Sequence, residues 1–156
     1  MSMLEARELS FPLREYRARL KGVRTRMVEE GLDLLLIHNL ADQCYLTGYQ
    51  TFDQVGYSYF FLPVEGEPLF EVWKTEAGGV RLNSWVKEIV PWETGVDPFD
   101  VTRQILEERG WAGARVGVDE EALTLGEYRR LRDVAGSVEL VNLTHFISSV
   151  RLVKTP

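Results

Sequence analysis

"LDLLLIH", residues 32–38, places four apolar side chains in an unbroken row between Asp33 and His38. A run of this kind is too short for a second long helix, and it is typical of a β-strand that other elements cover on both faces. We therefore predict a buried strand at residues 32–38. Such a strand indicates an α/β domain with helices on both sides of its sheet.

The preceding segment, residues 10–31, has the pattern of an amphipathic helix. Pro12 near its start and Gly31 just past its end fit the usual start and stop signals. Apolar side chains follow one another at alternating steps of three and four, which places them on one stripe. The stripe consists of Leu13, Tyr16, Leu20, Val23 and Met27.

The following segment, "NLADQCYLTGYQTFDQVGYSYFFLP" at residues 39–63, mixes aromatic and polar residues in a way that neither a plain helix nor a plain strand explains. We expect it to have three parts. Tyr45 and Leu46 anchor a short connection in the core, Gly48 supplies a turn with a positive φ, and the remainder is a loop that enters a hairpin.

Two strands are predicted next, at residues 57–62 and 69–74. They flank "PVEGE", whose proline and glycine favour a reversal, so the pair should form an antiparallel β-hairpin. Residues 75–85 are ambiguous, because two glycines weaken a helix there. "VKEIVPW", residues 86–92, has the pattern of another short strand.

Helices and strands alternate over the rest of the chain. Strands are expected at residues 114–119 and 138–142, and helices at 97–110, 124–136 and 143–154. Together with the hairpin, this alternation predicts a mixed, partly antiparallel sheet flanked by helices on both faces.

The helices at 97–110 and 124–136 begin with recognisable caps. Asp97 is expected to cap the first, and Thr124 with Glu127 has the spacing of a capping box in the second. The predicted buried faces consist of Phe99, Val101, Ile105 and Leu106 in the first helix and of Leu125, Tyr128 and Leu131 in the second.

Length and composition indicate one globular domain. The chain has 156 residues, of which 45% are hydrophobic and 27% are charged, close to the average for globular proteins. The formal net charge of -6 comes without a basic stripe, so we expect no nucleic acid partner. No apolar run approaches the ~20 residues of a membrane span and no secretory signal is visible, so we expect no membrane partner and a cytoplasmic location.

Residue chemistry alone indicates no convincing active site. His38 and His145 lie far apart in the sequence, and neither has a second His or Cys at metal-ligand spacing, so each is interpreted as a hydrogen-bonded histidine. Neither a glycine-rich phosphate loop nor a nucleophile elbow occurs. We therefore assign no catalytic residue and no metal ligand.

A set of landmarks in a fixed order is nevertheless distinctive. They are "LDLLLIHN" followed by "YLTGY", then the hairpin, "KTEAGGV", "RVGVDEEALTLGEYRRL" and "FISSVRLVKTP". Together they resemble the N-terminal domain of the creatinase and prolidase family. These dinuclear-metal hydrolases have a pita-bread catalytic domain and include Xaa-Pro dipeptidase, aminopeptidase P, creatinase and ectoine hydrolase. The resemblance covers nearly the whole chain and implies a ribonuclease H-like mixed sheet.

The resemblance also implies that the chemistry belongs to another domain. In the family all metal ligands lie in the catalytic domain that follows, so two divalent metals, Mn, Co or Zn, are expected there and none in this chain. Residues 1–150 would form the N-terminal domain, and residues 151–156 would start the linker to the absent catalytic domain. The parent would be a metallopeptidase or amidinohydrolase-type hydrolase, and the chain alone, excised or naturally truncated, is expected to be inactive.

The loop after "YLTG" is the candidate substrate-facing segment. In full-length relatives this domain supports dimerisation, and its loops restrict the substrates that reach the catalytic pocket. By that resemblance the candidate substrate-facing residues are Tyr49, Phe52, Asp53 and Tyr57. An alternative stays open, because the same aromatic residues would also occur if they only packed beneath the loop.

Two functions from different classes are therefore expected. The first is a non-catalytic N-terminal domain of a metal-dependent hydrolase that serves dimerisation and substrate restriction. Its partners would be its own C-terminal catalytic domain, a second copy in a homodimer, and a dipeptide or other small-molecule substrate. The alternative is a stand-alone, non-catalytic dimerisation or partner-binding module. A third possible function is an independent small-molecule sensor, which would need a closed pocket inside the domain.

Overall fold

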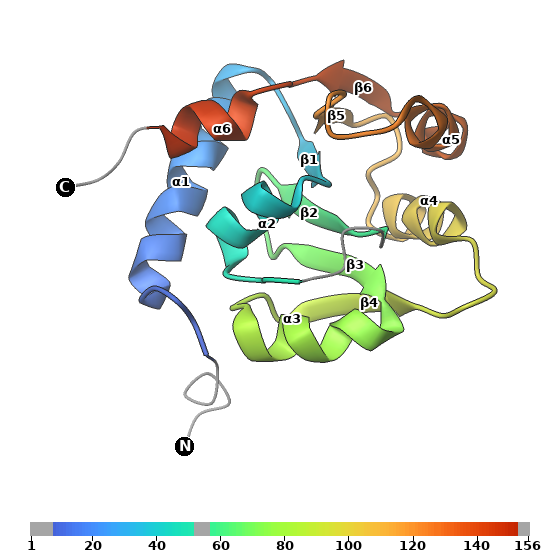
Figure 1. Ribbon diagram of the computed structural model, residues 1–156. Coiled ribbons are helices and arrows are strands. Elements are labelled where there is room, and N and C mark those ends of the chain that lie inside the picture. Colours follow the sequence, from blue (N-terminus) through green and yellow to red (C-terminus); the bar gives the residue numbers. More distant parts are fainter. Residues whose placement is uncertain (1–7, 52–56, 153–156) are drawn as a thin grey trace.

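The computed structural model describes residues 8–51 and 57–152. The helices are α1 (Leu13–Glu29), α2 (Leu40–Thr47), α3 (Ala77–Asn83), α4 (Pro98–Glu108), α5 (Leu125–Ala135) and α6 (Phe146–Arg151), with a 3₁₀ turn, η1 (Lys74–Glu76), before α3. The strands are β1 (Leu34–Ile37), β2 (Tyr59–Pro63), β3 (Leu69–Trp73), β4 (Glu88–Trp92), β5 (Arg115–Val118) and β6 (Glu139–Asn142). Figure 1 shows the strands gathered between the helices.

In the described part of the chain, six strands form one sheet in the order β4-β3-β2-β1-β5-β6. The strand β1 pairs antiparallel with β2 on one side and parallel with β5 on the other. β2 and β3 form the predicted antiparallel hairpin, whereas β3 with β4 and β5 with β6 pair in parallel. The predicted mixed, partly antiparallel sheet is confirmed, and the pairing changes direction at β1 and again at β3.

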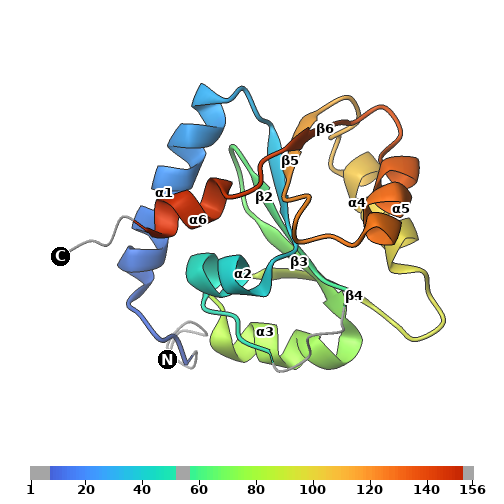
Figure 2. The ribbon, with the colours of Figure 1, turned by 45° about the horizontal axis from the view of Figure 1, so that its top comes forward.

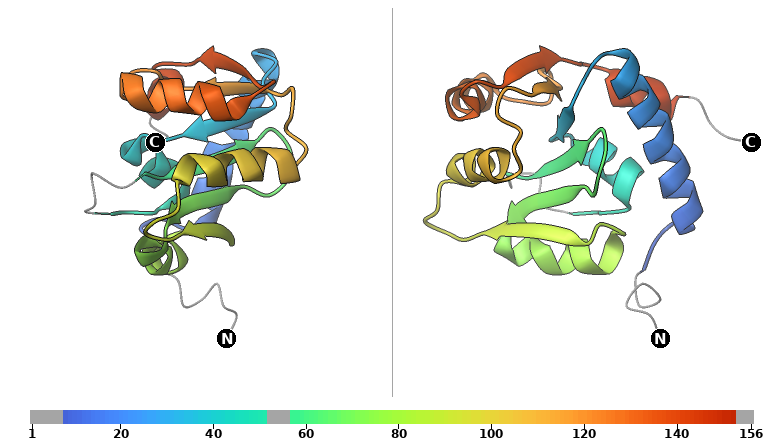
Figure 3. Two further views of the ribbon diagram at one scale, coloured as in Figure 1. Left: turned by 90° about the vertical axis from the view of Figure 1, so that its right-hand side faces the viewer. Right: turned by 180° about the vertical axis from the view of Figure 1, so that it is seen from behind.

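Helices cover both faces of this sheet, as predicted (Figures 2 and 3). α1, α2, α3 and α6 lie on one face, here called the α1 face, and α4 and α5 lie on the other, the α4 face. Side chains alternate along β1, so Leu35 and Ile37 join the core of the α1 face while Leu34 and Leu36 join the core of the α4 face. This alternation explains the unbroken apolar row and confirms the buried strand.

α1 packs on the sheet through the predicted stripe. Its buried side chains are Tyr16, Leu20, Val23 and Met27. Leu13, at the first helical position, is only partly buried. Near the other end, the Arg26 guanidinium lies 4.6 Å from the ring centroid of Phe146, which holds α6 against α1 (Figure 2).

Residues 40–47 form the helix α2, where we expected a short connection and no helix. The Asn39 side chain accepts two backbone N–H groups of the first turn, and Gly48 ends the helix in the left-handed conformation. The expectation was wrong because so short a helix shows no clear apolar period, and its caps are the stronger signal.

Gly48 and its neighbours otherwise match the prediction. The φ angle of Gly48 is +86°, and a Cβ atom there would lie 2.7 Å from the Asn83 carbonyl oxygen and 2.9 Å from Tyr16 Oη. Only glycine fits that position without strain. Leu46 is fully buried and Tyr45 packs, partly buried, against the same core, so their predicted anchoring is confirmed.

The ambiguous segment at 75–85 contains η1 and α3, although Gly78 and Gly79 lie within the helix. Ala77 and Val80 are buried in the core of the α1 face, so tertiary packing outweighs the weak helix propensity. The strand predicted after it is present as β4 at the edge of the sheet.

The predicted caps of α4 and α5 are confirmed. Asp97 Oδ1 accepts the backbone N–H of Phe99 over 3.0 Å. Thr124 and Glu127 make both hydrogen bonds of a capping box. The predicted core residues of α4 are buried except for Val101, which is only partly buried.

The predicted buried face of α5 needs one correction. Leu131 is fully buried and Tyr128 is partly buried, but Leu125 is 63% exposed. Leu125 lies six residues before Leu131, and at about 100° per residue this spacing turns it about 120° away from that buried side chain. α6 also begins later than predicted, at Phe146, after His145 in a left-handed conformation with φ 66°.

Candidate functional site

The described ends of the candidate loop lie at the end of the sheet where β1 ends and β2 begins. Of the four predicted substrate-facing residues, the structure places Tyr49, which follows α2, and Tyr57, which precedes β2. Phe52 and Asp53 lie outside the described residues. The geometry of the site therefore rests on the two tyrosines and their partners.

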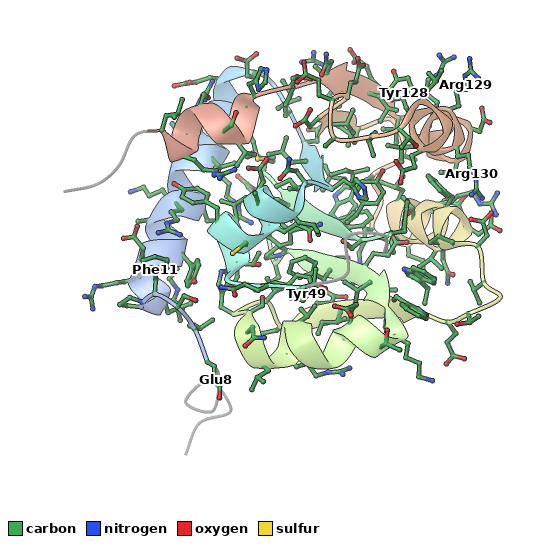
Figure 4. The ribbon with its side chains drawn as sticks, in the orientation of Figure 1. Glu8, Phe11, Tyr49, Tyr128, Arg129 and Arg130 are labelled. Atoms are coloured by element: carbon green, nitrogen blue, oxygen red, sulfur yellow. The ribbon has the colours of Figure 1, made fainter. Side chains whose placement is uncertain are left out.

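Tyr49 lies in the interior of the molecule, between α2 and α3 (Figure 4). Its side chain is 2% exposed and packs edge-to-face on Phe70, with ring centroids 5.3 Å apart. The Tyr49 hydroxyl donates to Glu76 Oε2 over 2.6 Å, and Thr51 Oγ1 donates to the same oxygen over 2.7 Å. Glu76 thus ties two residues of the loop to η1. Its role depends on tertiary contact and was not predicted.

Tyr57 joins the core of the α4 face instead. Its ring packs on Phe99 with centroids 4.6 Å apart, and its hydroxyl lies 2.7 Å from Thr102 Oγ1. Thr102 Oγ1 in turn donates to Glu71 Oε2 over 2.6 Å. Because the Thr102 hydroxyl proton points to Glu71, Tyr57 is the donor in the first bond. The hydroxyls of Tyr49 and Tyr57 are both engaged inside the domain.

Glu71, at the end of this hydrogen-bonded chain, is a fully buried acid on β3. Burial raises the pKa of Glu71 to about 8, although the hydrogen bond from Thr102 opposes the shift. Among the described residues, Glu71 Oε1 has no hydrogen-bond partner. The carboxyl is therefore mostly protonated at neutral pH. Sequence reasoning missed it, although the alternation in "LFEVW" puts Glu71 on the same face as Leu69.

Tyr49 and Tyr57 meet at one narrow cavity, which Glu76 and Trp73 also line. Its volume, about 10 Å³, leaves room for no more than one water molecule. The structure thus brings the two predicted tyrosines together and buries both. They form a fixed frame on which the described ends of the loop rest.

His38 stands beside this frame, at the carboxyl end of β1. Its Nδ1 donates to the Ser58 carbonyl oxygen over 2.8 Å, so its Nε2 is the ring nitrogen that lies 3.8 Å from Glu127 Oε1. Burial raises the pKa of Glu127, but hydrogen bonds from Thr124 and the nearby His38 outweigh it and leave that pKa lowered. The interpretation of His38 as a hydrogen-bonded histidine at a strand end is confirmed.

An ion pair between a buried aspartate and an exposed arginine joins α2 to α6. Asp42 is 6% exposed, and Arg151 Nη1 donates to Asp42 Oδ1 over 2.8 Å. Burial raises the pKa of Asp42, and Arg151 opposes that shift. Asp42 also borders a cavity of about 20 Å³ at the carboxyl ends of β1 and β5, room for one water molecule. The pair therefore connects the helix before Tyr49 with the first residue of the predicted linker.

Two negative findings apply to residues 8–51 and 57–152. No group of three or more His, Cys, Asp or Glu side chains in these ranges is arranged to hold a metal ion. No helix in the same ranges has the length and apolarity needed to cross a membrane.

Residues 19–153 match the sequence model of a protein family described as the Creatinase/Prolidase N-terminal domain. The match begins inside α1 and takes in every strand of the described sheet. It covers the two tyrosines, Glu76 and the ion pair between α2 and α6.

Two curated proteins and one solved structure illustrate the likeness. The putative dipeptidase YkvY of Bacillus subtilis is 25% identical over 136 residues, which cover 87% of this chain and 38% of that protein. The ectoine hydrolase of Halomonas elongata is 26% identical over 159 residues, which cover 95% and 40%. The prolidase of Thermococcus sibiricus has the same fold, with a TM-score of 0.77 and 19% identity over 90% of this chain and 38% of that one. The chain thus spans about 40% of the length of the curated relatives it matches.

Proposed function

The chain belongs to the creatinase/prolidase N-terminal domain family, and we propose that it is the non-catalytic N-terminal domain of a metal-dependent hydrolase of the Xaa-Pro dipeptidase or creatinase type. The extent of the family match carries this proposal. That match covers residues 19–153, whereas the curated relatives are much longer than the region they share with this chain. In the parent enzyme the domain restricts which substrates reach the catalytic pocket and supports a homodimer.

The hydrolytic chemistry, on this proposal, belongs to a following domain that holds two divalent metals, Mn, Co or Zn. Such metals activate a water for attack on the scissile carbon and stabilise the resulting negative charge. The described residues of this chain offer no ligand set for them. The contribution of this chain is therefore to orient the substrate and to exclude molecules of the wrong size or charge.

The loop between Tyr49 and Tyr57 carries that contribution. The four candidate residues are proposed as one substrate-binding segment, and the burial of Tyr49 and Tyr57 supports different roles for its members. Tyr49 and Tyr57 hold the loop through their bonds to Glu76 and Thr102. Phe52 and Asp53 would then contact the substrate, and the carboxylate of Asp53 would favour a cationic group.

Activity of the isolated chain is the first test. Purified 156-residue protein is incubated with Mn²⁺ or Co²⁺ and, separately, with Xaa-Pro dipeptides, creatine and ectoine. No turnover above the protein-free control is expected, because catalytic metal ligands would be supplied by the following domain. Turnover of any of these substrates would overturn the proposal.

A charge-removing substitution tests the loop in the full-length enzyme. Asp53→Asn should lower kcat/KM for a cationic substrate by about tenfold relative to a neutral one, since the opposite charge near the substrate is lost. Glu65→Gln is the matched control, because Glu65 is an exposed acid in the turn between β2 and β3. Equal discrimination by wild type and Asp53→Asn would exclude Asp53 as a substrate-facing residue.

The proposed homodimer has an independent test. Light scattering with size exclusion gives the mass of the full-length enzyme, and then of the same enzyme without residues 1–150. A dimer that dissociates when this domain is removed supports the proposed role. A dimer that persists without the domain would assign assembly to the catalytic domain alone. A dimer formed equally well by the 156-residue chain would show that this domain is sufficient for assembly.

A further inference from the structure

A groove runs along α1 at the end of the sheet opposite Tyr49 and Tyr57. This hollow is here called the α1 groove. It is lined by Leu13, Arg17, Leu20, Arg24, Trp85 and Lys87. The turn between β2 and β3 forms its other wall, and Lys87 directly precedes β4. Its volume is about 220 Å³. A second, shallower hollow of about 400 Å³ shares three of its residues and continues along α1 to Lys21 and Val28.

The floor of the α1 groove is apolar. Leu20 is 7% exposed, Pro68 is buried, and Trp85 is partly buried with its indole N–H donating to the Leu46 carbonyl oxygen over 2.9 Å. That hydrogen bond fixes the indole ring of Trp85 in the floor of the groove. At the far end of the second hollow, Val28 is 67% exposed, which is high for a valine on a folded domain.

The rim of the groove is cationic. Arg17 and Lys21 on α1 and Lys87 before β4 are exposed, and none has an ion-pair partner among the described residues. Arg24 is held in place by bonds to the carbonyl oxygens of the turn between β2 and β3. Glu67 is the acidic residue that lines the same hollow. This concentration of positive charge stands on a chain whose net charge is -6.

We propose that the α1 groove binds an acidic peptide segment of a partner protein, with apolar anchors on the groove floor and carboxylates beside Arg17, Lys21 and Lys87. Charge complementarity selects the acidic partner. The apolar floor selects a peptide with Leu-like anchors, because a nucleic acid backbone would leave that floor uncovered. Leu13 and Val28 lie about 22 Å apart along the helix axis, which matches a helical segment of about 15 residues.

This interaction surface does not depend on the proposed enzymatic role. Pro63, at the end of β2, pairs with Leu34 at the start of β1, so the turn that walls the groove is at the opposite end of the sheet from the loop. A partner bound there would leave the frame around Tyr49 and Tyr57 uncovered. The groove was not predicted, because its rim combines residues from α1 with Lys87, which is distant in sequence.

A designed peptide tests the proposal on the 156-residue chain. The probe is a labelled amphipathic peptide of about 15 residues with Leu on one face and Glu on the flanks, followed by fluorescence anisotropy. Arg17→Glu with Lys21→Glu should weaken binding by at least about tenfold, and raised salt should weaken binding to the wild type. Arg129→Glu with Arg132→Glu is the matched control, with the same charge change on exposed residues of α5. Figure 4 shows Arg129 on the side of the molecule away from α1.

Further measurements separate the remaining outcomes. The Trp85 indole N–H signal, assigned with Trp85→Phe, should shift when the peptide is added, whereas that of Trp92 should stay. Lys87→Glu supplies a single-site variant if the double variant misfolds, and it should also weaken binding. No binding by the wild type would overturn the proposal. So would equal weakening in the control variant, equal competition by duplex DNA, or self-association through the groove.

Discussion

The two faces of the sheet bury different chemistry. On the α1 face, strands β1 to β3 contribute only apolar side chains to the core, among them Phe60 and Phe70. On the α4 face, the same strands bury the pair of Glu71 and Tyr59 next to the pair of Leu69 and Phe61. On the α1 face these strands therefore contribute to stability by apolar packing alone. The other face combines packing with a buried proton, so its stability should depend on pH.

The largest expected effect concerns the Glu71 proton. The pKa of Glu71 is raised from its ordinary value of 4.5 to about 8, so the folded state holds a proton that the unfolded state has already lost. Stability from this group is fully present below pH 4.5 and falls as the pH rises toward about 8. The loss approaches about 5 kcal/mol as an upper limit. Glu71→Gln should remove this slope and be the more stable protein at pH 8.

Urea unfolding of wild type and Glu71→Gln at several pH values between 5 and 9 measures the slope. Glu65→Gln, on the exposed turn between β2 and β3, controls for the loss of one carboxylate. Stability curves that run parallel for wild type and Glu71→Gln would show that Glu71 is ionised in the folded protein.

A large effect without pH dependence is expected on the α1 face. Phe70→Ala should lower the free energy of unfolding by about 3–5 kcal/mol, because Phe70 is fully buried and packs on Phe60 and Tyr49. The difference from wild type should be the same at pH 5 and pH 8. Phe61→Ala, equally buried on the α4 face, is the matched variant. If the loss of stability caused by Phe70→Ala changed with pH, the packing of the α1 face would depend on the protonation of Glu71 on the other face.

A medium effect should follow from Thr102→Val, which keeps the shape of the side chain and removes its hydroxyl. Tyr57 then loses its acceptor and Glu71 its donor, at a cost of about 1–3 kcal/mol. Because Thr102 opposes the rise in the pKa of Glu71, its removal should move the stability slope to higher pH. Thermal unfolding at pH 6 and pH 9 checks both effects. Unchanged stability would mean that water replaces the hydroxyl.

The smallest effect is expected at the frame of the loop. Tyr49→Phe removes the hydrogen bond to Glu76, which is partly exposed, and should lower stability by about 1 kcal/mol. The ring still packs on Phe70, so the fold is kept. Amide exchange should increase at Thr51 and Glu76 rather than across the sheet. Uniformly faster exchange would show that the bond supports the whole domain instead of the loop.

Local patterns predicted most of the fold. The apolar row at 34–37, the stripe of α1 and the caps at Asp97 and Thr124 each act within a few residues, so the sequence shows them directly. α2 was missed because it is short, and Leu125 was misplaced because a spacing of six residues turns it away from Leu131 on the helix.

The candidate site was less predictable, since its partners are distant in sequence. Tyr49 was identified, but its bond to Glu76 depends on η1 turning back toward α2. The partners of Tyr57 come from β3 and α4, and only the folded chain brings Thr102 and Glu71 to it. The burial of Glu71 was not predicted either. A glutamate in a strand normally indicates a solvent-facing position, whereas Glu71 is fully buried.

The change of pairing direction at β1 has a consequence for the order of folding. β1 meets β2 across fewer than 30 residues of chain, but it meets β5 across about 80, as in the pair Leu34 and Val116. Closing the longer loop costs more chain entropy, so the half built from β1, β2 and β3 should form first. Pulsed amide exchange during refolding should protect Phe61 before Val118. During synthesis, that early half would complete its hairpin before β5 is made. Until then, the edge of β1 that pairs with β5 would have no neighbouring strand.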